Sequence, residues 1–260
     1  MKTAIIIPAR YGSSRFPGKP LAKIAGKTLL QRVFEIGQDA IAGKGGITLA
    51  AATEDQRIAD YCEDENIPCV MTSENCATGS DRVLEAAEKL GDFDVLLSLQ
   101  GDALYTPVEA ITKMIGVFEE KPDTDVVTPV VPLRWADLDA LREQKKTAPF
   151  SGTTAVIDKN GKALWFSKNI LPAIRKEDRD TEFSPVHQHL GLYGYRTDVL
   201  KKFVSLAQGH YEQLEGLEQL RFLENGISIQ TVSLHVDIGQ VKSGIDTPED
   251  LARAEKFFAA

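Results

Sequence analysis

The sequence predicts an α/β protein whose mainly parallel sheet is covered by helices and carries a smaller α+β lobe. Two observations support this fold class. Short apolar runs rich in β-branched residues alternate with amphipathic helical stretches through the first half of the chain, as in repeated βα units. After about residue 150 this alternation gives way to a hairpin signal, the Asn-Gly pair at 160–161 between two apolar runs. We therefore expect one domain over residues 1–260, with the lobe within about 133–223.

The first half of the chain begins with a strand and a long loop. Thr3–Pro8 is a β-branched apolar run that stops at a proline, which is typical of a strand buried on both faces. A loop rich in Gly, Ser and Pro follows over 11–20. Apolar residues recur at helical spacing over 28–39, and Thr53 can cap a later helix. Further strands are expected at 47–52, 68–71, 95–99 and 126–131, and further helices at 82–90 and 108–118.

The second half is predicted to mix strands and helices. Apolar runs at 155–157 and 163–166 flank the Asn-Gly turn, and 190–195 is expected to form another strand. The loop over 174–185 contains a run of charged residues, so we expect it to act as a mobile lid. Helices are expected at 198–206 and 211–223.

Composition and charge exclude several classes of protein. Lys and Arg number 30 against 38 Asp and Glu, so a chain with a formal charge of −8 has no broad basic face for a nucleic acid polymer. No apolar stretch approaches the roughly 20 residues of a membrane helix, and the apolar opening is too short for a signal peptide. Cys62, Cys69 and Cys76 are an odd number, which suits reduced thiols. We expect a cytoplasmic protein that acts on small molecules and has no membrane partner.

The loop that follows the first strand carries the strongest functional signal. Arg10, Arg15 and Lys19 place three positive charges near it, and Gly12 and Gly18 let backbone amides approach a ligand closely. In an open α/β sheet, ligands bind at the carboxyl ends of the strands, where this loop must lie. The pattern predicts a phosphate cradle for a nucleoside triphosphate, although it matches neither the Walker motif nor G-x-G-x-x-G. The alternative is a solvated basic turn.

Two aspartates from distant parts of the chain are candidate metal ligands. Asp102 ends an apolar strand, and Asp246 lies in the late turn before Thr247 and Pro248. Two carboxylates are what a hard divalent cation needs when nucleotide phosphates complete its oxygen shell. From spacing alone, however, capping of the last helix by Asp246 or Thr247, with Asp250 completing the pattern, is the stronger interpretation.

The cradle and the two aspartates are part of a longer set of motifs that match the pattern of one protein family. With them, the chain resembles the sugar-acid cytidylyltransferases, and most closely the 3-deoxy-manno-octulosonate cytidylyltransferase family, almost end to end. The motifs are far more specific together than any one of them alone. They are Pro8–Leu21, Met71–Thr72, Thr78–Arg82, Leu99–Asp102, Ala163–Ser167, His189–Tyr195, Leu217–Arg221 and Gly244–Leu251.

The resemblance implies a Rossmann-like fold of the nucleotide-diphospho-sugar transferase type. It also implies a Mg²⁺-dependent enzyme that transfers CMP from CTP to the anomeric hydroxyl of a 3-deoxy-2-keto sugar acid, with pyrophosphate as the second product, in lipopolysaccharide or capsule biosynthesis. The lobe would bind the sugar and form a homodimer. The resemblance moves Asp246 to a metal-binding role beside Asp102 and leaves Thr247 as the helix cap. The catalytic residues would be Lys19, Arg10, Asp102 and Asp246.

The same resemblance assigns residues to the two substrates. Those expected at the nucleotide are Ala9, Arg10, Arg15, Lys19, Ser80, Arg82 and Gln100. Those expected at the sugar are Gln100, Lys168, Arg175, His189, Tyr193, Glu218 and Gln219. Several of them have plainer interpretations: Ser80 and Asp81 can cap a helix, His189 can be a packed strand residue, and Glu218 can be a solvated helix residue.

The sequence departs from the family pattern near the expected sugar end. Ala103 and Leu104 stand where an acidic or amide residue and Pro are usual, Gln188 and Lys168 replace Arg, and Thr154 replaces Lys. These changes leave nucleotidyl transfer intact but open the choice of acceptor. The alternatives are therefore a cytidylyltransferase for an 8-amino-octulosonate or a nonulosonate, and a nucleotide-binding regulator of the same fold without turnover.

Overall fold

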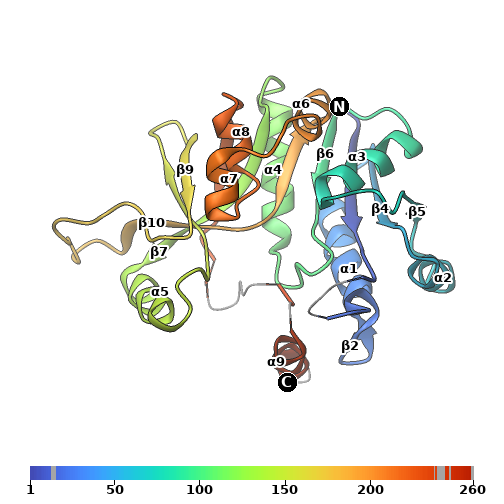
Figure 1. Ribbon diagram of the computed structural model, residues 1–260, viewed down its shortest axis with the longest axis horizontal. Helices are drawn as coiled ribbons and strands as arrows, with labels where there is room; N and C mark the ends of the chain where they lie inside the picture. The colour runs from blue at the N-terminus through green and yellow to red at the C-terminus, as the bar shows by residue number, and fades with distance from the viewer. Residues whose placement is uncertain (13–15, 237, 239–243, 246, 259–260) are drawn as a thin grey trace. The chain divides into compact units, whose positions relative to one another are not determined.

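The computed structural model describes residues 1–12, 16–236, 238, 244–245 and 247–258 (Figure 1). The chain forms two compact units. The first contains residues 1–112, 194–204 and 242–260, and the second contains residues 113–193 and 205–241. The second unit therefore extends beyond both ends of the lobe expected within about 133–223. None of the described helices has both the length and the hydropathy needed to cross a bilayer.

The first unit is built on parallel strands. Its central strand, β1 (Thr3–Pro8), pairs in parallel with two neighbours, and the residues at 3–7 are all buried, as expected for a strand covered on both faces. The other strands of this parallel set are β4 (Ile47–Thr53) and β6 (Val95–Ser98) beside β1, and β5 (Cys69–Met71) beside β4. The helices that pack against them are α1 (Leu29–Ile41), α2 (Gln56–Asp64) and α3 (Gly79–Leu90) (Figure 1). The predicted series of parallel βα units is confirmed.

Short polar residues begin these helices, although two predicted caps are wrong. β4 continues through Thr53, so α2 begins three residues later and is capped by Asp55, which accepts from Arg57 N at 3.0 Å. Thr78, rather than Ser80, caps α3, because that helix already begins at Gly79. The Thr78 hydroxyl accepts from Asp81 N at 3.2 Å, and the Asp81 carboxylate accepts from Thr78 N at 2.8 Å.

Within its described residues, the first unit also contains a further strand of this sheet, two short strands and four helical segments. The last helix, α9, begins with the same kind of cap: Thr247 N donates to Asp250 at 2.9 Å, and Asp250 N donates back to the Thr247 hydroxyl at 3.2 Å. The expected role of Thr247 as the cap is confirmed, whereas Asp246 lies outside the described residues. The elements of the first unit besides the four parallel strands and their three helices are η1 (Lys19–Leu21), β2 (Lys23–Ile24), β3 (Lys27–Thr28), α4 (Val108–Glu120, which continues into the second unit), β11 (Tyr193–Arg196), α6 (Thr197–Val204) and α9 (Pro248–Phe258).

The second unit contains a mixed sheet. Its long strand pairs in parallel with the last strand of the chain and antiparallel with β10, beyond which a hairpin continues the sheet. Gly161, with φ of +79°, occupies the predicted Asn-Gly turn of that hairpin. The strands are β7 (Val126–Arg134), β8 (Thr154–Ile157), β9 (Ala163–Ser167), β10 (Phe183–His189) and β12 (Ile229–Ser233). The α/β fold class with a mainly parallel, mixed sheet is confirmed.

Two expectations for residues 190–223 need correction, and one further helix was not expected. The strand expected at 190–195 is interrupted, because β10 ends at His189 and Leu192 N turns back to Leu190 O at 2.7 Å before β11 begins. The helix expected at 211–223 is broken by Gly216, which has a φ of +62° and ends the first segment. The two segments are α7 (His210–Glu215) and α8 (Leu220–Glu224), and an unexpected helix, α5 (Trp135–Thr147), precedes the hairpin.

The charged loop at 174–185 is attached to α5 by ion pairs. Arg179 pairs with Asp139 at 2.9 Å and with Glu177 at 2.7 Å, and Arg142 contacts both of these carboxylates at 3.1 and 2.8 Å. The last three residues of the loop are already part of β10. The structure therefore places the predicted lid against α5, with four charges closing a ring.

Candidate functional site

The nucleotide candidates gather where β1 and β6 end and α3 begins. The ideal Cβ position of Gly79 lies 3.6 Å from Gln100 Oε1 and 3.7 Å from Pro8 Cγ, so these three residues are neighbours. Gln100 Nε2 also donates to the hydroxyl of Ser98 at 3.0 Å. Ala9, which is buried, continues β1 by donating its N–H to Ala52 O at 2.8 Å. The predicted carboxyl edge of the parallel strands is thus where the sequence motifs meet.

Gly101 is fixed by the closeness of the first strand. A Cβ atom at this position would lie 2.6 Å from the carbonyl oxygen of Pro8, a backbone atom that has no freedom to rotate away. Substitution by any larger residue must therefore push the cradle loop away from β6.

We expect Gly101→Ala to lower the free energy of unfolding by about 1–3 kcal/mol and to raise the KM for CTP, since the clash moves the backbone that leads into the cradle. Urea unfolding and steady-state kinetics measure both effects. Gly116→Ala is the matched control, because no atom lies within 4 Å of its added Cβ. In the middle of α4 that change should stabilise by about 0.5–1 kcal/mol. If Gly101→Ala has the stability and the KM for CTP of wild type, the close approach of Gly101 to Pro8 O has no role.

The cradle loop is closed by a hydrogen bond and a stacked side chain. Gly18, with φ of +73°, donates its N–H to Tyr11 O at 2.9 Å, so the loop returns to its starting point. The guanidinium of Arg57 lies 3.3 Å from the centre of the Tyr11 ring. Arg10 is exposed and reaches Ala77 O at 3.5 Å. Arg15, the remaining cradle cation, lies outside the described residues.

Lys19 and Asp102 form an ion pair beside this loop. Lys19 Nζ lies 2.7 Å from Asp102 Oδ2, and the two side chains are 15% and 31% exposed. A ligand therefore has access to both groups. The pair joins a cation expected at the phosphates to a carboxylate expected at a metal, although the two residues are far apart in the sequence.

Two distant parts of the chain meet at Asp102. The chain returns to it near the C-terminus, where Ile245 N donates to Asp102 O at 3.3 Å and an added Cβ at Gly244 would lie 3.2 Å from Asp102 Oδ1. Asp246 follows at once in the sequence. Within the described part of the chain, no three His, Cys, Asp or Glu side chains are grouped to hold a metal. Mg²⁺ takes few protein ligands and keeps phosphate and water oxygens, so Asp102 together with Asp246 would fit it.

Ser80 and Arg82 lie inside the first unit. Arg82 has no exposed surface, pairs with Glu54 at 2.8 Å and donates to the hydroxyl of Thr72. Ser80 is 6% exposed. This arrangement favours an indirect role, in which Arg82 holds α3 and its N-terminal turn in place beside Gln100. Direct contact of these two residues with cytidine stays a prediction.

His189 is the best-defined of the sugar candidates in the second unit. It ends β10, is buried, and packs between the rings of Phe166 and Tyr193, whose centres lie 4.9 and 5.4 Å away. Its Nε2 lies 2.9 Å from the hydroxyl of Thr128. Burial, with a smaller contribution from the positive charge of Lys168, lowers the pKa of His189 to about 3. The imidazole is therefore neutral at physiological pH.

The lowered pKa of His189 predicts a pH dependence of stability. In the unfolded chain this group titrates near 6.5, so protonation favours unfolding as the pH falls from 6.5 towards 3. The stabilisation from the neutral imidazole is complete above pH 6.5 and is lost as the pH falls. We expect wild type to lose about 2 kcal/mol more than His189→Gln between pH 8 and pH 5 in urea unfolding. His210→Gln, at an exposed histidine, is the control and should follow wild type. Equal losses in wild type and His189→Gln would contradict the prediction.

Lys168, another sugar candidate, is held by a carboxylate that sequence reasoning missed. Glu215 accepts from the Ser167 hydroxyl at 2.7 Å and from Lys168 N at 2.8 Å. Lys145 donates to Lys168 O at 2.6 Å from the other side. The backbone of Lys168 is thus fixed at both its N–H and its carbonyl oxygen, and its charge acts on His189.

The turn between α7 and α8 carries the last two sugar candidates, Glu218 and Gln219. A buried ion pair joins the two helices: Arg221 donates to the carboxylate of Glu212 at 2.7 and 2.5 Å. Gln219 is 4% exposed, and its Nε2 has no hydrogen-bond partner among the described residues. A buried amide N–H without a partner is unusual and leaves a donor available for a hydrogen-bond acceptor. Arg175 is exposed, and no contact in the described structure joins it to the other candidates.

Two of the departures from the family pattern are cross-strand partners. Gln188 of β10 pairs directly with Thr154 of β8. The hydroxyl of Thr154 donates to Asn169 O at 2.7 Å and accepts from Leu171 N at 3.1 Å, so this side chain ties down the segment after β9. A strand pair that the family pattern would make cationic is neutral here.

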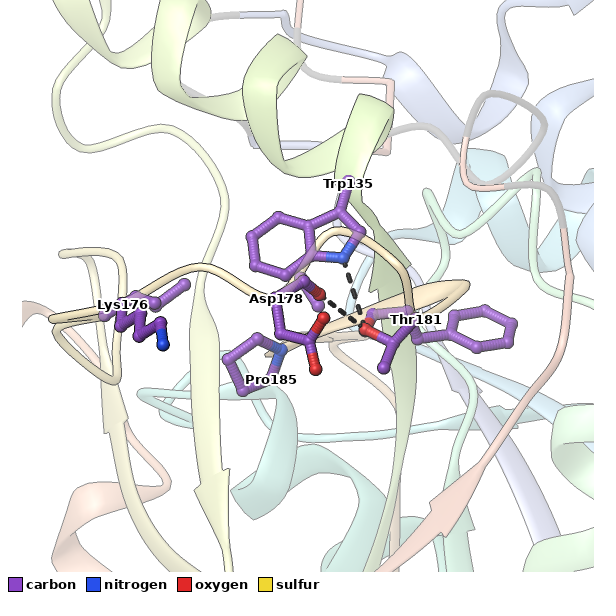
Figure 2. Close-up of a pocket in the computed structure, with 8 residues that line it drawn as sticks. Trp135, Lys176, Asp178, Thr181 and Pro185 are labelled. Carbon is purple, nitrogen blue, oxygen red and sulfur yellow. Dashed lines mark hydrogen bonds between the residues drawn. The ribbon is translucent and has the colours of Figure 1, made fainter.

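A separate hollow of about 330 Å³ lies in the second unit (Figure 2). Thr181 Oγ1 accepts from Trp135 Nε1 at 3.4 Å and donates to Asp178 O at 2.8 Å within it. None of the predicted sugar residues lines this hollow. The lining residues are Trp135, Ile174, Lys176, Asp178, Thr181, Phe183, Ser184 and Pro185.

Comparison with known proteins identifies the family of the chain. Residues 4–229 match the cytidylyltransferase family model. The chain is 41% identical to the 3-deoxy-manno-octulosonate cytidylyltransferase of Maricaulis maris, over 100% of this chain and 98% of that protein. It is 40% identical to the enzyme of the same name from Bacteroides thetaiotaomicron, over 99% and 98%. A solved structure of CMP:2-keto-3-deoxy-manno-octonic acid synthetase in complex with CTP aligns with a TM-score of 0.84 at 30% identity, over 100% of this chain and 99% of that chain. The chain therefore belongs to the 3-deoxy-manno-octulosonate cytidylyltransferase family.

Proposed function

We propose that this protein transfers CMP from CTP to the C2 hydroxyl of 3-deoxy-manno-octulosonate, giving CMP-sugar and pyrophosphate for lipopolysaccharide or capsule biosynthesis. The ion pair between Lys19 and Asp102 is the observation that carries the proposal. It supports the proposal because it joins a cation suited to phosphate and a carboxylate suited to a metal, beside a loop closed by Gly18.

The reaction is a displacement at the α-phosphorus. The C2 oxygen forms a bond to that phosphorus while the bond to the bridging oxygen of the β-phosphate breaks, pyrophosphate leaves, and the hydroxyl proton is released. Lys19, Arg10 and Arg15 neutralise the triphosphate and orient it, and Gln100 contacts nucleotide or sugar. Because phosphoryl-type transfer needs mainly positioning and charge neutralisation, these residues require no dedicated base beside them.

Asp102 and Asp246 are proposed to hold Mg²⁺ for this reaction. When bound there, the ion supplies positive charge to the phosphate oxygens and lowers the pKa of the attacking hydroxyl. Asp102 supports the proposal by its partial exposure and by the return of the chain at Gly244 and Ile245.

The sugar is proposed to bind in the second unit at Lys168, Arg175, His189, Tyr193, Glu218 and Gln219. A fixed cation at Lys168 and an unsatisfied buried amide at Gln219 support this assignment. Arg175 would clamp the carboxylate of the sugar acid. The neutral pair of Gln188 and Thr154 supports a difference in discrimination at the hydroxyls or the tail of the sugar.

The acting form is proposed to be a cytoplasmic homodimer. The three cysteines are free thiols, as a reducing compartment maintains. Leu164 on the edge strand β9 and Leu214 on α7 are 58% and 70% exposed, and a second copy would cover such side chains. Sedimentation of the purified protein would give twice the mass of the 28.5 kDa chain if the dimer forms.

Pyrophosphate release measured with CTP, Mg²⁺ and a panel of sugar acids tests the proposal. We expect turnover with 3-deoxy-manno-octulosonate, and none when UTP or ATP replaces CTP at the same concentration. A strong preference for the 8-amino analogue or for a nonulosonate would assign the modified acceptor instead. CTP binding without turnover on any sugar acid would assign a regulator, an interpretation that the presence of both Asp102 and Asp246 disfavours because binding alone needs no metal at the α-phosphate.

A further inference from the structure

Thr128, a residue without any marked role in the sequence, contacts His189 from the middle of β7. It has no exposed surface. Its Oγ1 lies 2.9 Å from His189 Nε2, 2.8 Å from Leu192 O and 3.4 Å from Leu190 O. One hydroxyl therefore faces one imidazole nitrogen and two backbone carbonyl oxygens.

The number of available protons settles the direction of these bonds. A threonine hydroxyl has one proton to donate and two lone pairs that accept, whereas a carbonyl oxygen only accepts. The contact of 2.8 Å to Leu192 O is a hydrogen bond only if the hydroxyl donates to it. The hydroxyl must then accept from His189, so Nε2 carries a hydrogen. The opposite arrangement would leave two lone pairs facing each other in a buried place, which is costly.

The second nitrogen of His189 is left as an acceptor. Because the imidazole is neutral, a hydrogen on Nε2 leaves a lone pair on Nδ1. Nδ1 makes no hydrogen bond with the described residues. The ring is held between Phe166 and Tyr193, so it presents this nitrogen in a fixed direction.

We propose that Thr128 is a positioning residue that locks His189 in the Nε2–H tautomer, so that Nδ1 accepts a hydrogen bond from a hydroxyl or ammonium group of the sugar and rejects its carboxylate. The identity of the ligand rests on the proposed function. An ionised carboxylate has no hydrogen to donate, and its lone pairs would face the lone pair on Nδ1. The carboxylate must therefore bind at cations such as Lys168 or Arg175, while His189 recognises a donor elsewhere on the sugar.

The tautomer is measured directly by two-bond ¹H–¹⁵N correlation spectra of the full chain labelled at its four histidines, without substrates and at neutral pH. The His189 signals are assigned from the spectrum of His189→Gln. We expect the ¹⁵N shift of an unprotonated nitrogen at Nδ1 and of a protonated nitrogen at Nε2. The reverse pattern, or a doubly protonated ring, would overturn the proposal.

Three variants test whether Thr128 imposes this state. Thr128→Val should bring up signals of the Nδ1–H tautomer and lower kcat/KM for 3-deoxy-manno-octulosonate about tenfold, with the KM for CTP unchanged. Thr128→Ser, which keeps the hydroxyl, should restore both. Thr231→Val is the matched control, since Thr231 is the cross-strand partner of Thr128 and donates instead to Gly161 O at 2.8 Å. It should leave the tautomer and kcat/KM unchanged. If His189 keeps the Nε2–H tautomer in Thr128→Val, the proposal that Thr128 imposes this tautomer is overturned.

Deoxy analogues of the sugar, each lacking one hydroxyl, identify what His189 recognises. We expect one analogue to be poorer than the parent sugar by about tenfold in wild type, and this penalty to disappear in Thr128→Val. Equal penalties in both proteins at every position would overturn the role in recognition. Because the tautomer is observed without substrate, failure of the proposed sugar activity leaves that result in place. Normal activity with the Nδ1–H tautomer would defeat this inference alone.

Discussion

Asp102→Asn is expected to lower kcat by two to three orders of magnitude, the largest effect of any single change considered. A metal-phosphate interaction contributes several kcal/mol to the transition state, and an amide in place of the carboxylate removes the negative charge that holds the cation, so about 3–4 kcal/mol should be lost. Pyrophosphate release at saturating CTP and sugar measures the effect. Folding should change little, because the asparagine oxygen still accepts from Lys19 and water partly screens the charge that is lost at the 31% exposed Asp102.

The matched control is Asp94→Asn, at the opposite end of β6. Asp94 accepts from Lys2 N at 2.7 Å and lies just before the strand that Asp102 follows. Its replacement removes the same charge from the same part of the sheet and should leave kcat unchanged. Near-normal turnover of Asp102→Asn with Mg²⁺, in a protein that unfolds like wild type, would refute the metal assignment.

Lys19→Met should reduce kcat/KM for CTP by about 10- to 100-fold. Methionine keeps much of the length and removes only the ammonium, so a charge-assisted contact with phosphate worth about 1.5–3 kcal/mol is lost. Isothermal titration with CTP separates weaker binding from slower transfer. Arg15→Ala should act in the same direction, on the sequence pattern alone.

Lys27→Met provides the comparison for Lys19→Met. Lys27 lies a few residues further along the chain, is exposed and pairs with Glu35 at 2.6 Å. Loss of its charge should leave CTP affinity unchanged. If both variants bind CTP and turn over like wild type, the loop is a solvated basic turn, as the plainer interpretation of the sequence holds.

The sequence correctly predicted those elements whose structure depends on residues close together in the chain. The buried strand Thr3–Pro8 follows from a β-branched run, and the Thr247 cap follows from a short polar side chain before Pro248. The errors arose where one residue ended or extended an element although the spacing of the apolar residues predicted otherwise. Gly216 broke a helix whose hydrophobic spacing continues across it, and Asp55 replaced Thr53 because the strand before it was one residue longer than its apolar run.

Partners that meet only in the folded chain left no local signal. Arg82 was expected at the nucleotide because of its motif, but its buried ion pair with Glu54 depends on how α3 packs beside β4. Thr128 and His189 are sixty-one positions apart, and nothing near Thr128 marks it out. Glu215, which fixes Lys168, lies on a different element from it. The residues expected to touch a ligand were thus easier to nominate from the sequence than the residues that hold them in place.

The hydrogen bond that Ile245 N donates to Asp102 O can form only late in the synthesis of the chain. The first unit is discontinuous, because residues 194–204 and 242–260 must join residues 1–112. Ribosomes add about 5–20 residues per second, so roughly ten to thirty seconds separate the synthesis of Asp102 from that of Ile245. During that interval the second unit is translated. The first unit, which carries the nucleotide candidates, therefore begins to form first and is completed last. A nascent chain exposes the unfinished edge of its sheet to chaperones while the second unit emerges.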